Sequence, residues 1–248
     1  MSGLIYRIFA VSKKKLFLLT FILFVFELLI LLTAVSCNCG NLAKLDEGTV
    51  KSVQNMLCNV ANYFAPFFIL FIMIAVIVDT VSDDLRTHWR SYAYTLPVSA
   101  LRYNAAFYIM IAAIGTSLIA FLTLCSAIVA CITDRDFTAD SFKKILVLSS
   151  VVIIYSLIEY NLVSLVRNGK VAKAISVVTI LAFIYGGFFI LFRDLLKKDA
   201  DQVAIIMQKK EQFEKFTDNI SPYLPFILIG AFVLNWFISV KLTQRREK

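Results

Sequence analysis

Six long apolar runs, separated by short polar segments, dominate the pattern of this 248-residue chain. The runs are continuously apolar, and each approaches the ~20 residues that an α-helix needs to cross the hydrocarbon layer of a bilayer. Only helices and closed barrels satisfy their backbone in lipid, and barrel strands would alternate. The pattern predicts an all-α membrane protein, with a single transmembrane domain over residues 1–248. The spans are predicted at about 16–35, 64–81, 104–132, 145–166, 174–192 and 224–240.

Composition supports this interpretation. The chain is 60% hydrophobic and contains 22 Phe, whereas soluble domains are about 45–50% apolar. The net charge of +8 could indicate nucleic-acid binding, but the charges flank the apolar runs and form no single basic face. We therefore expect no nucleic-acid partner. The first run is too long for the apolar core of a signal peptide, so we expect a retained span.

Lys and Arg residues indicate the orientation. If the N-terminus is cytoplasmic, the inner segments carry 14 of them and the two short outer loops carry five. The long segment 193–223 carries six, balanced by six acidic residues. Because cytoplasmic loops are enriched in Lys and Arg, both termini are predicted to be cytoplasmic.

Two segments outside the spans have helical spacing. Residues 4–11 place Arg7 opposite several apolar side chains, which predicts a short N-terminal interfacial helix, with a frayed terminus as the alternative. In segment 193–223, apolar residues recur at near-helical spacing among charges. This predicts an amphipathic helix that lies on the outer membrane face or folds against the spans.

No catalytic or metal site is predicted. The single histidine, His88, excludes the paired-His zinc patterns. The chain has no Walker A sequence and no Gly-rich dinucleotide loop, which argues against the usual phosphate cradle. A paired-glutamate membrane protease would need clustered acids, but Glu27 and Glu159 lie on different predicted spans. We therefore expect that this chain is no enzyme.

Polar residues inside the spans are candidates for a substrate path. They are Glu27, Glu159, Asn161 and Asn235. A carboxylate at the bilayer centre costs roughly 2.5–3.5 kcal/mol on insertion scales, so each should face protein or a water-filled path. The alternative is helix–helix hydrogen bonding, with Glu27 protonated.

Three cysteines, Cys37, Cys39 and Cys58, fall on the predicted outer side, where oxidation is possible. A bridge from Cys37 or Cys39 to Cys58 would tie the first span to the second. Free thiols are the alternative.

The most informative segment, 82–103, lies between the second and third predicted spans. Ser82 with two following aspartates is a helix-start pattern, and Pro97 would end that helix. Three large aromatic residues suit a membrane surface: Trp89, Tyr92 and Tyr94. The pattern predicts a short surface helix that could serve as a lever for a soluble partner.

The sequence of this segment resembles that of ABC-2-type permeases, the membrane subunits of ATP-binding cassette transporters. The resemblance rests on an acidic pair followed by Trp-Arg-x-Tyr-x-x-Thr-Leu-Pro-Val-Ser at 89–99. It implies that the segment is a coupling helix, which docks into a separate ATPase. The residues implied to form or support this dock are Asp83, Asp84, Trp89, Arg90, Tyr92, Thr95, Leu96 and Pro97.

The resemblance also implies a function. The chain would be a multi-pass permease of a bacterial plasma membrane that pairs with itself or a paralogue and with two copies of an ABC ATPase. ATP and Mg²⁺ would bind the ATPase, and this chain would need no cofactor. The Phe-rich sequence favours export of an amphipathic or hydrophobic substrate, and the loop resembles that of exporters of amphipathic peptides, including phenol-soluble modulins and lantibiotics. The alternative is a non-transporting scaffold or sensor subunit that uses the same loop to hold a cytoplasmic partner.

Overall fold

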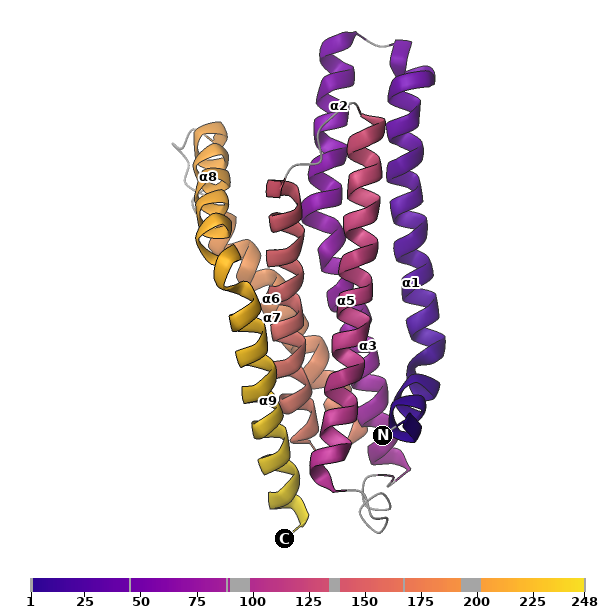
Figure 1. Ribbon diagram of the computed structural model, residues 1–248, viewed down its shortest axis with the longest axis vertical. Helices are drawn as coiled ribbons and strands as arrows, with labels where there is room; N and C mark the ends of the chain where they lie inside the picture. Colours follow the sequence, from indigo (N-terminus) through magenta and orange to yellow (C-terminus); the bar gives the residue numbers. More distant parts are fainter. Residues whose placement is uncertain are drawn as a thin grey trace.

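Long helices lying side by side make up the fold. The computed structural model describes residues 2–44, 46–87, 89, 99–133, 139–166, 168–192 and 202–247. Within these residues, six helical stretches are long and apolar enough to cross a membrane, which confirms the predicted all-α class with six spans. Figure 1 shows both termini at the same end of the bundle, as an even number of crossings requires. That this end is cytoplasmic stays a prediction from the charges.

The first helix, α1 (Ser2–Cys39), joins the predicted N-terminal helix at 4–11 to the predicted first span. No Gly or Pro occurs between residues 4 and 39, so nothing in the sequence ends the helix between the two parts. Figure 1 shows that the first turns of α1 bend away from the axis of the rest. The helical alternative for residues 4–11 is confirmed, and their position at a membrane surface stays a prediction.

The segment that follows α1 folds back along that helix. It consists of a 3₁₀ turn, η1 (Asn41–Lys44), and α2 (Glu47–Asn59). Asp46 caps α2, because its side chain accepts a hydrogen bond from the Thr49 N–H at 2.9 Å. A hydrogen bond from the Thr49 hydroxyl, together with that from the Thr49 N–H, holds the pKa of Asp46 below its ordinary value. The segment therefore forms a helical hairpin on top of the spans (Figure 1).

A π-helical turn, η2 (Val60–Phe64), connects α2 directly to α3 (Ala65–Arg86). In this turn the N–H of Ala65 donates to the carbonyl of Val60, five residues earlier. Pro66 gives the physical reason. A proline ring has no N–H and crowds the carbonyl four residues before it in a regular α-helix, and the wider π-helical turn relieves that crowding.

The end of α3 corrects one prediction. Residues Ser82, Asp83 and Asp84, which were expected to open a new helix, belong to α3. The sequence has no Gly or Pro between residues 67 and 86, so the span continues past its apolar part. Acidic side chains are unfavourable at the carboxyl end of a helix, so this acidic pair needs cations nearby. Most of the predicted surface helix (88 and 90–98) lies outside the described residues.

The next three spans follow the predicted order. α5 (Ala100–Ile132) is capped by the side chain of Ser99. α6 (Ala139–Ser164) begins earlier than predicted, because residues 139–144, expected to be loop, form its first turns. An acidic residue in that first turn is favourable at the amino end of a helix. α7 (Gly169–Phe192) is the next helix.

The predicted amphipathic helix in the long outer segment is confirmed as α8 (Gln202–Ile220). It packs against α6, so of the two predicted placements the structure shows the one in which it folds against the spans. A short 3₁₀ turn, η4 (Ser221–Tyr223), then leads into the last span, α9 (Leu224–Glu247).

The helices α3 and α6 lie at the centre of the bundle. α3 packs against α1, α5, α6 and α7, and α6 also packs against α5, α7 and α9. Gly115 of α5 permits the close approach of three helices. A Cβ atom added there would lie 2.9 Å from Cδ1 of Ile153 on α6 and 3.1 Å from Cε of Met73 on α3. The interior of the single chain is therefore tightly packed at this level.

Candidate coupling site and buried polar seam

Arg7, in the first turns of α1, contacts the α3 end of the loop that connects α3 to α5. Its guanidinium donates to Asp84 and, at 3.1 Å, to Oδ2 of Asp83. It also lies 4.5 Å from the centre of the Trp89 ring. The hydroxyl of Tyr103, at the start of α5, donates to Oδ2 of Asp84. We name these five residues the Arg7 cluster. It joins α1, α3, α5 and the α3–α5 loop.

Burial is deepest at one carboxylate of the Arg7 cluster. The side chain of Asp84 is 2% exposed, whereas those of Arg7 and Asp83 are 18% and 20% exposed. A buried carboxylate is tolerated only where charge and hydrogen bonds replace its hydration, and Arg7 and Tyr103 supply both. Asp83 also pairs with Arg86 at 2.9 Å. These cations offset the unfavourable position of two acids at the carboxyl end of α3.

Three residues of the predicted ATPase dock lie in the Arg7 cluster: Asp83, Asp84 and Trp89. Because Asp84 is buried against Arg7 and Tyr103, any part that it plays in a dock is support and not contact. The remaining predicted dock residues lie outside the described residues: Arg90, Tyr92, Thr95, Leu96 and Pro97. The docking role of the whole set stays a prediction.

A line of hydrogen-bonded polar side chains connects α5, α6 and α9. Asn161 of α6 donates to Oδ1 of Asn235 on α9 at 2.8 Å. The hydroxyl of Ser239, one turn further along α9, donates to Oδ1 of Asn161 at 2.5 Å. It lies 2.7 Å from the hydroxyl of Tyr108 on α5. All of these side chains are buried.

The same line continues one turn closer to the termini. Asn104 of α5 donates to Thr243 of α9 at 3.2 Å and accepts a hydrogen bond from Tyr160 of α6 at 3.0 Å. The ring of Tyr160 stacks on Phe107 with centroids 3.9 Å apart. We name the hydrogen-bonded residues the polar seam: Asn104, Tyr108, Tyr160, Asn161, Asn235, Ser239 and Thr243. Its interhelical hydrogen bonds fix the relative rotation of three spans.

The two predicted path glutamates lie elsewhere. Glu159 of α6 faces α7, where its carboxylate accepts a hydrogen bond from Thr179 at 2.7 Å. Glu27 of α1 is 2% exposed, and neither of its oxygens has a hydrogen-bond partner in the described part of the chain. Of the four predicted path residues, the structure brings together only Asn161 and Asn235. Their bond is of the helix–helix kind that the sequence left as the alternative, and the path role of all four stays a prediction.

The three cysteines at the end of α1 and in α2, predicted to lie on the outer side, carry free thiols. Cys37 is buried and Cys39 is exposed, both in the last turn of α1. The sulfur of Cys58 lies 3.8 Å from the hydroxyl of Thr133. A bridge to Cys58 stays a prediction for oxidising conditions.

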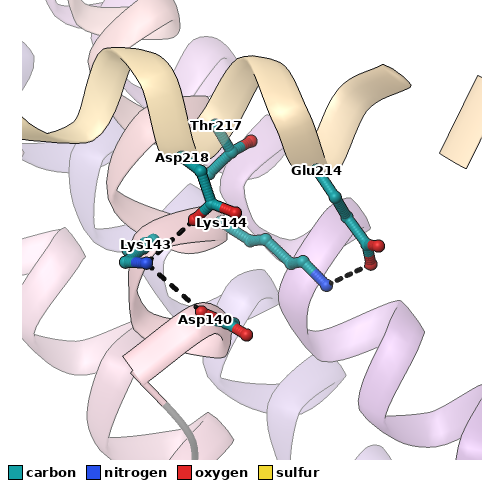
Figure 2. A pocket seen from close by; sticks show the side chains of 6 residues that line it. All are labelled: Asp140, Lys143, Lys144, Glu214, Thr217 and Asp218. Atoms are coloured by element: carbon teal, nitrogen blue, oxygen red, sulfur yellow. Dashed lines mark hydrogen bonds and ion pairs between the residues drawn. The ribbon is translucent and has the colours of Figure 1, made fainter. Parts of the chain in front are cut away.

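A small charged hollow of about 110 Å³ lies between α6 and α8, at the end of the bundle opposite the termini. Figure 2 shows Lys143 between Asp218 at 2.8 Å and Asp140 at 3.3 Å, and Lys144 reaching Glu214 at 2.9 Å. The hydrogen bonds to these two aspartates, that of Asp218 first, raise the pKa of Lys143. The ion pairs hold α8 against α6, which the sequence did not specify.

Some residues of the Arg7 cluster and of the polar seam were not predicted, although the sequence contains a pattern that indicates them. Arg7 is the only charged residue among the first twelve, so a buried partner could have been expected for it. Asn235, Ser239 and Thr243 recur every four residues along an otherwise apolar span, which is the spacing of one helical face. Their partners on α5 and α6 could not be read from this pattern.

A comparison with protein families bears on the identity of the chain. The model of a family described as ABC-2 family transporter protein matches residues 55–244. The chain belongs to this family. None of the curated proteins compared with this ABC-2 permease matches it. Family membership makes it the membrane component of a transporter, a multi-pass membrane protein. The matched range contains Asp83, Asp84, Trp89 and Tyr103, and Arg7 lies before it.

Proposed function

We propose that this ABC-2 permease is the membrane half of a bacterial exporter driven by a separate ABC ATPase. The observation that carries the proposal is the Arg7 cluster. It ties the ends of the loop that resembles an ATPase dock to three spans, in a chain whose family forms the membrane part of transporters.

The Arg7 cluster supports a route for force. A push from the ATPase on the α3–α5 loop would act on α3 through Asp83 and Asp84, and on α5 through Tyr103. Arg7 would carry the same displacement to α1. ATP and Mg²⁺ bind the ATPase in this scheme, and two ATPase copies serve two permease chains, identical or paralogous, in the plasma membrane.

The packing of the chain supports a path at its surface and not through its core. The close approach of α3, α5 and α6 at Gly115 supports movement of the substrate between two permease chains. The exposed face of α1 is rich in phenylalanine, including Phe17, Phe21 and Phe24. Such a surface favours an amphipathic or hydrophobic substrate, and we propose a peptide. A non-transporting scaffold would pack equally tightly, but family membership favours transport.

The test is purification of the mildly solubilised chain from its own host, followed by an ATPase assay of whatever accompanies it. A stoichiometric soluble ATPase is expected with the wild type and lost with Trp89→Ala and Leu96→Ala. Leu124→Ala, at a side chain 60% exposed on α5, is the matched control and should retain the ATPase. Absence of an ATPase from the wild-type preparation would refute the proposal.

A further inference from the structure

We propose that Arg7 is a positioning residue for ATPase docking, because its guanidinium holds the first end of the α3–α5 loop in one arrangement. The inference rests on the proposed function and deepens it. It assigns a role in docking to a residue of α1, which lies outside the loop and before the residues that the family model matches.

The geometry uses properties that belong to arginine alone. One guanidinium donates to Asp84 and Asp83 and places its carbon 4.5 Å from the centre of the Trp89 ring. Arginine presents several N–H donors in a planar fork, and the plane of that fork can also stack on an aromatic ring. Lysine would keep the charge but would lose the fork and the stacking surface. Arg86 is no substitute, because within the described residues it pairs with Asp83 alone and its side chain is 79% exposed.

The burial of Asp84 makes the loss of its ion pair with Arg7 costly. Asp84 is 2% exposed, and removing one partner of a buried charge pair is far more costly than removing an exposed one. Without Arg7, the carboxylates of Asp83 and Asp84 and the Trp89 ring lose their contact with the guanidinium on α1, while the packing of α3 on α1 remains. A smaller fraction of the permease then holds Asp83, Asp84 and Trp89 in the arrangement that the ATPase binds. The apparent dissociation constant rises by the inverse of that fraction, while turnover of the bound complex is unchanged.

The chain offers a matched control on the same two helices. Lys15 of α1 pairs with Asp79 of α3 at 2.5 Å. Lys15 is 54% exposed and takes no part in the Arg7 cluster. Lys15→Gln therefore removes the same charge and one α1–α3 ion pair without touching the ends of the loop.

The experiment titrates permease in lipid nanodiscs with the ATPase that co-purifies with the wild type, and records the ATPase rate. Arg7→Gln should weaken the apparent affinity about tenfold, which corresponds to a competent fraction of about one in ten, with an unchanged maximal rate. Arg7→Lys should lie between Arg7→Gln and the wild type. Lys15→Gln should match the wild type. Fluorescence of Trp89, measured in a Trp236→Phe background because the chain has two tryptophans, reports whether the contact is broken.

Two results would overturn the inference. One is wild-type affinity for Arg7→Gln when the Trp89 emission has changed. The other is a lower maximal rate at unchanged affinity, which would mean only that less permease is folded. If Arg7→Gln does not fold, Arg7→Lys decides between the same outcomes. Failure of the wild type to bind any ATPase would instead refute the proposed function, and this inference with it.

Discussion

Replacing Asn161 by leucine probes what the polar seam contributes to stability. The substitution keeps the branched shape and the number of heavy atoms of a side chain that is 7% exposed. It removes the donor to Asn235 at 2.8 Å and the acceptor of the Ser239 hydroxyl at 2.5 Å. It also removes the longer contact, at 3.5 Å, from the Asn161 amide to the backbone carbonyl of Asn235.

The expected loss follows from these contacts. An interhelical hydrogen bond in a membrane contributes about 0.6 kcal/mol on average and up to about 1.7 kcal/mol. The stranded partners keep other bonds, because Asn235 still donates to the carbonyl of Ala231 at 2.8 Å and Ser239 remains 2.7 Å from the Tyr108 hydroxyl. The penalty for leaving them unsatisfied is therefore partial. We expect the free energy of unfolding to fall by about 1–3 kcal/mol.

The assay is an unfolding titration from mild detergent into SDS, which gives the free energy of unfolding directly. Thr116→Val is the control, since Thr116 is exposed and bonds only to its own helix, 2.9 Å from the carbonyl of Ala112. It should change stability by less than about 0.5 kcal/mol. A double-mutant cycle of Asn161→Leu with Ser239→Ala should show coupling. If Asn161→Leu matches the control, the seam does not stabilise the fold and our reasoning is wrong.

Three further predictions follow from other contacts. Gly115→Val should lower the free energy of unfolding by about 1–3 kcal/mol in the same titration, because its Cβ would lie 2.9 Å from Ile153; unchanged stability would contradict the close approach. The pKa of Lys143 is raised above its ordinary 10.5. Its bond to Asp218 should therefore hold α8 against α6 at pH values below 10.5, and this stabilisation should be lost as the pH rises through the raised pKa. A spin label on α8 should therefore gain mobility at alkaline pH, and Lys143→Met should abolish the transition. The exposed thiol of Cys39 should react with a membrane-impermeant maleimide on intact cells, whereas labelling only after permeabilisation would contradict the predicted topology.

The existence and order of the spans were accessible from sequence because the cost of burying polar groups in lipid leaves long apolar runs. Their ends were harder to predict. Hydropathy marks where the lipid ends, but a helix ends only where the backbone leaves the helical conformation. The end of α3 and the start of α6 both extend beyond the apolar part of the span. No proline or glycine interrupts them, so charged residues such as Asp84 continue the helix.

The candidate site, too, was only partly predictable from the sequence. The motif that resembles the family marked Asp83, Asp84 and Trp89, because such motifs are local in sequence. Their partner Arg7 lies 76 residues from Asp83 along the chain, and no local pattern encodes a contact over that separation. The polar face of α9 was readable, but its pairing with Asn161 depends on how the helices are arranged around it.

The start of α5 has a consequence for how the length of the chain can vary. Tyr103 and Asn104 are adjacent, so their side chains point about 100° apart around the helix. Tyr103 bonds to α3, and Asn104 bonds to α6 and α9. A residue inserted or deleted between Ser99 and Tyr103 would rotate both out of reach of their partners at once. Insertions before Ser99 would leave these two contacts untouched, whereas the first turn of α5 tolerates no change in length.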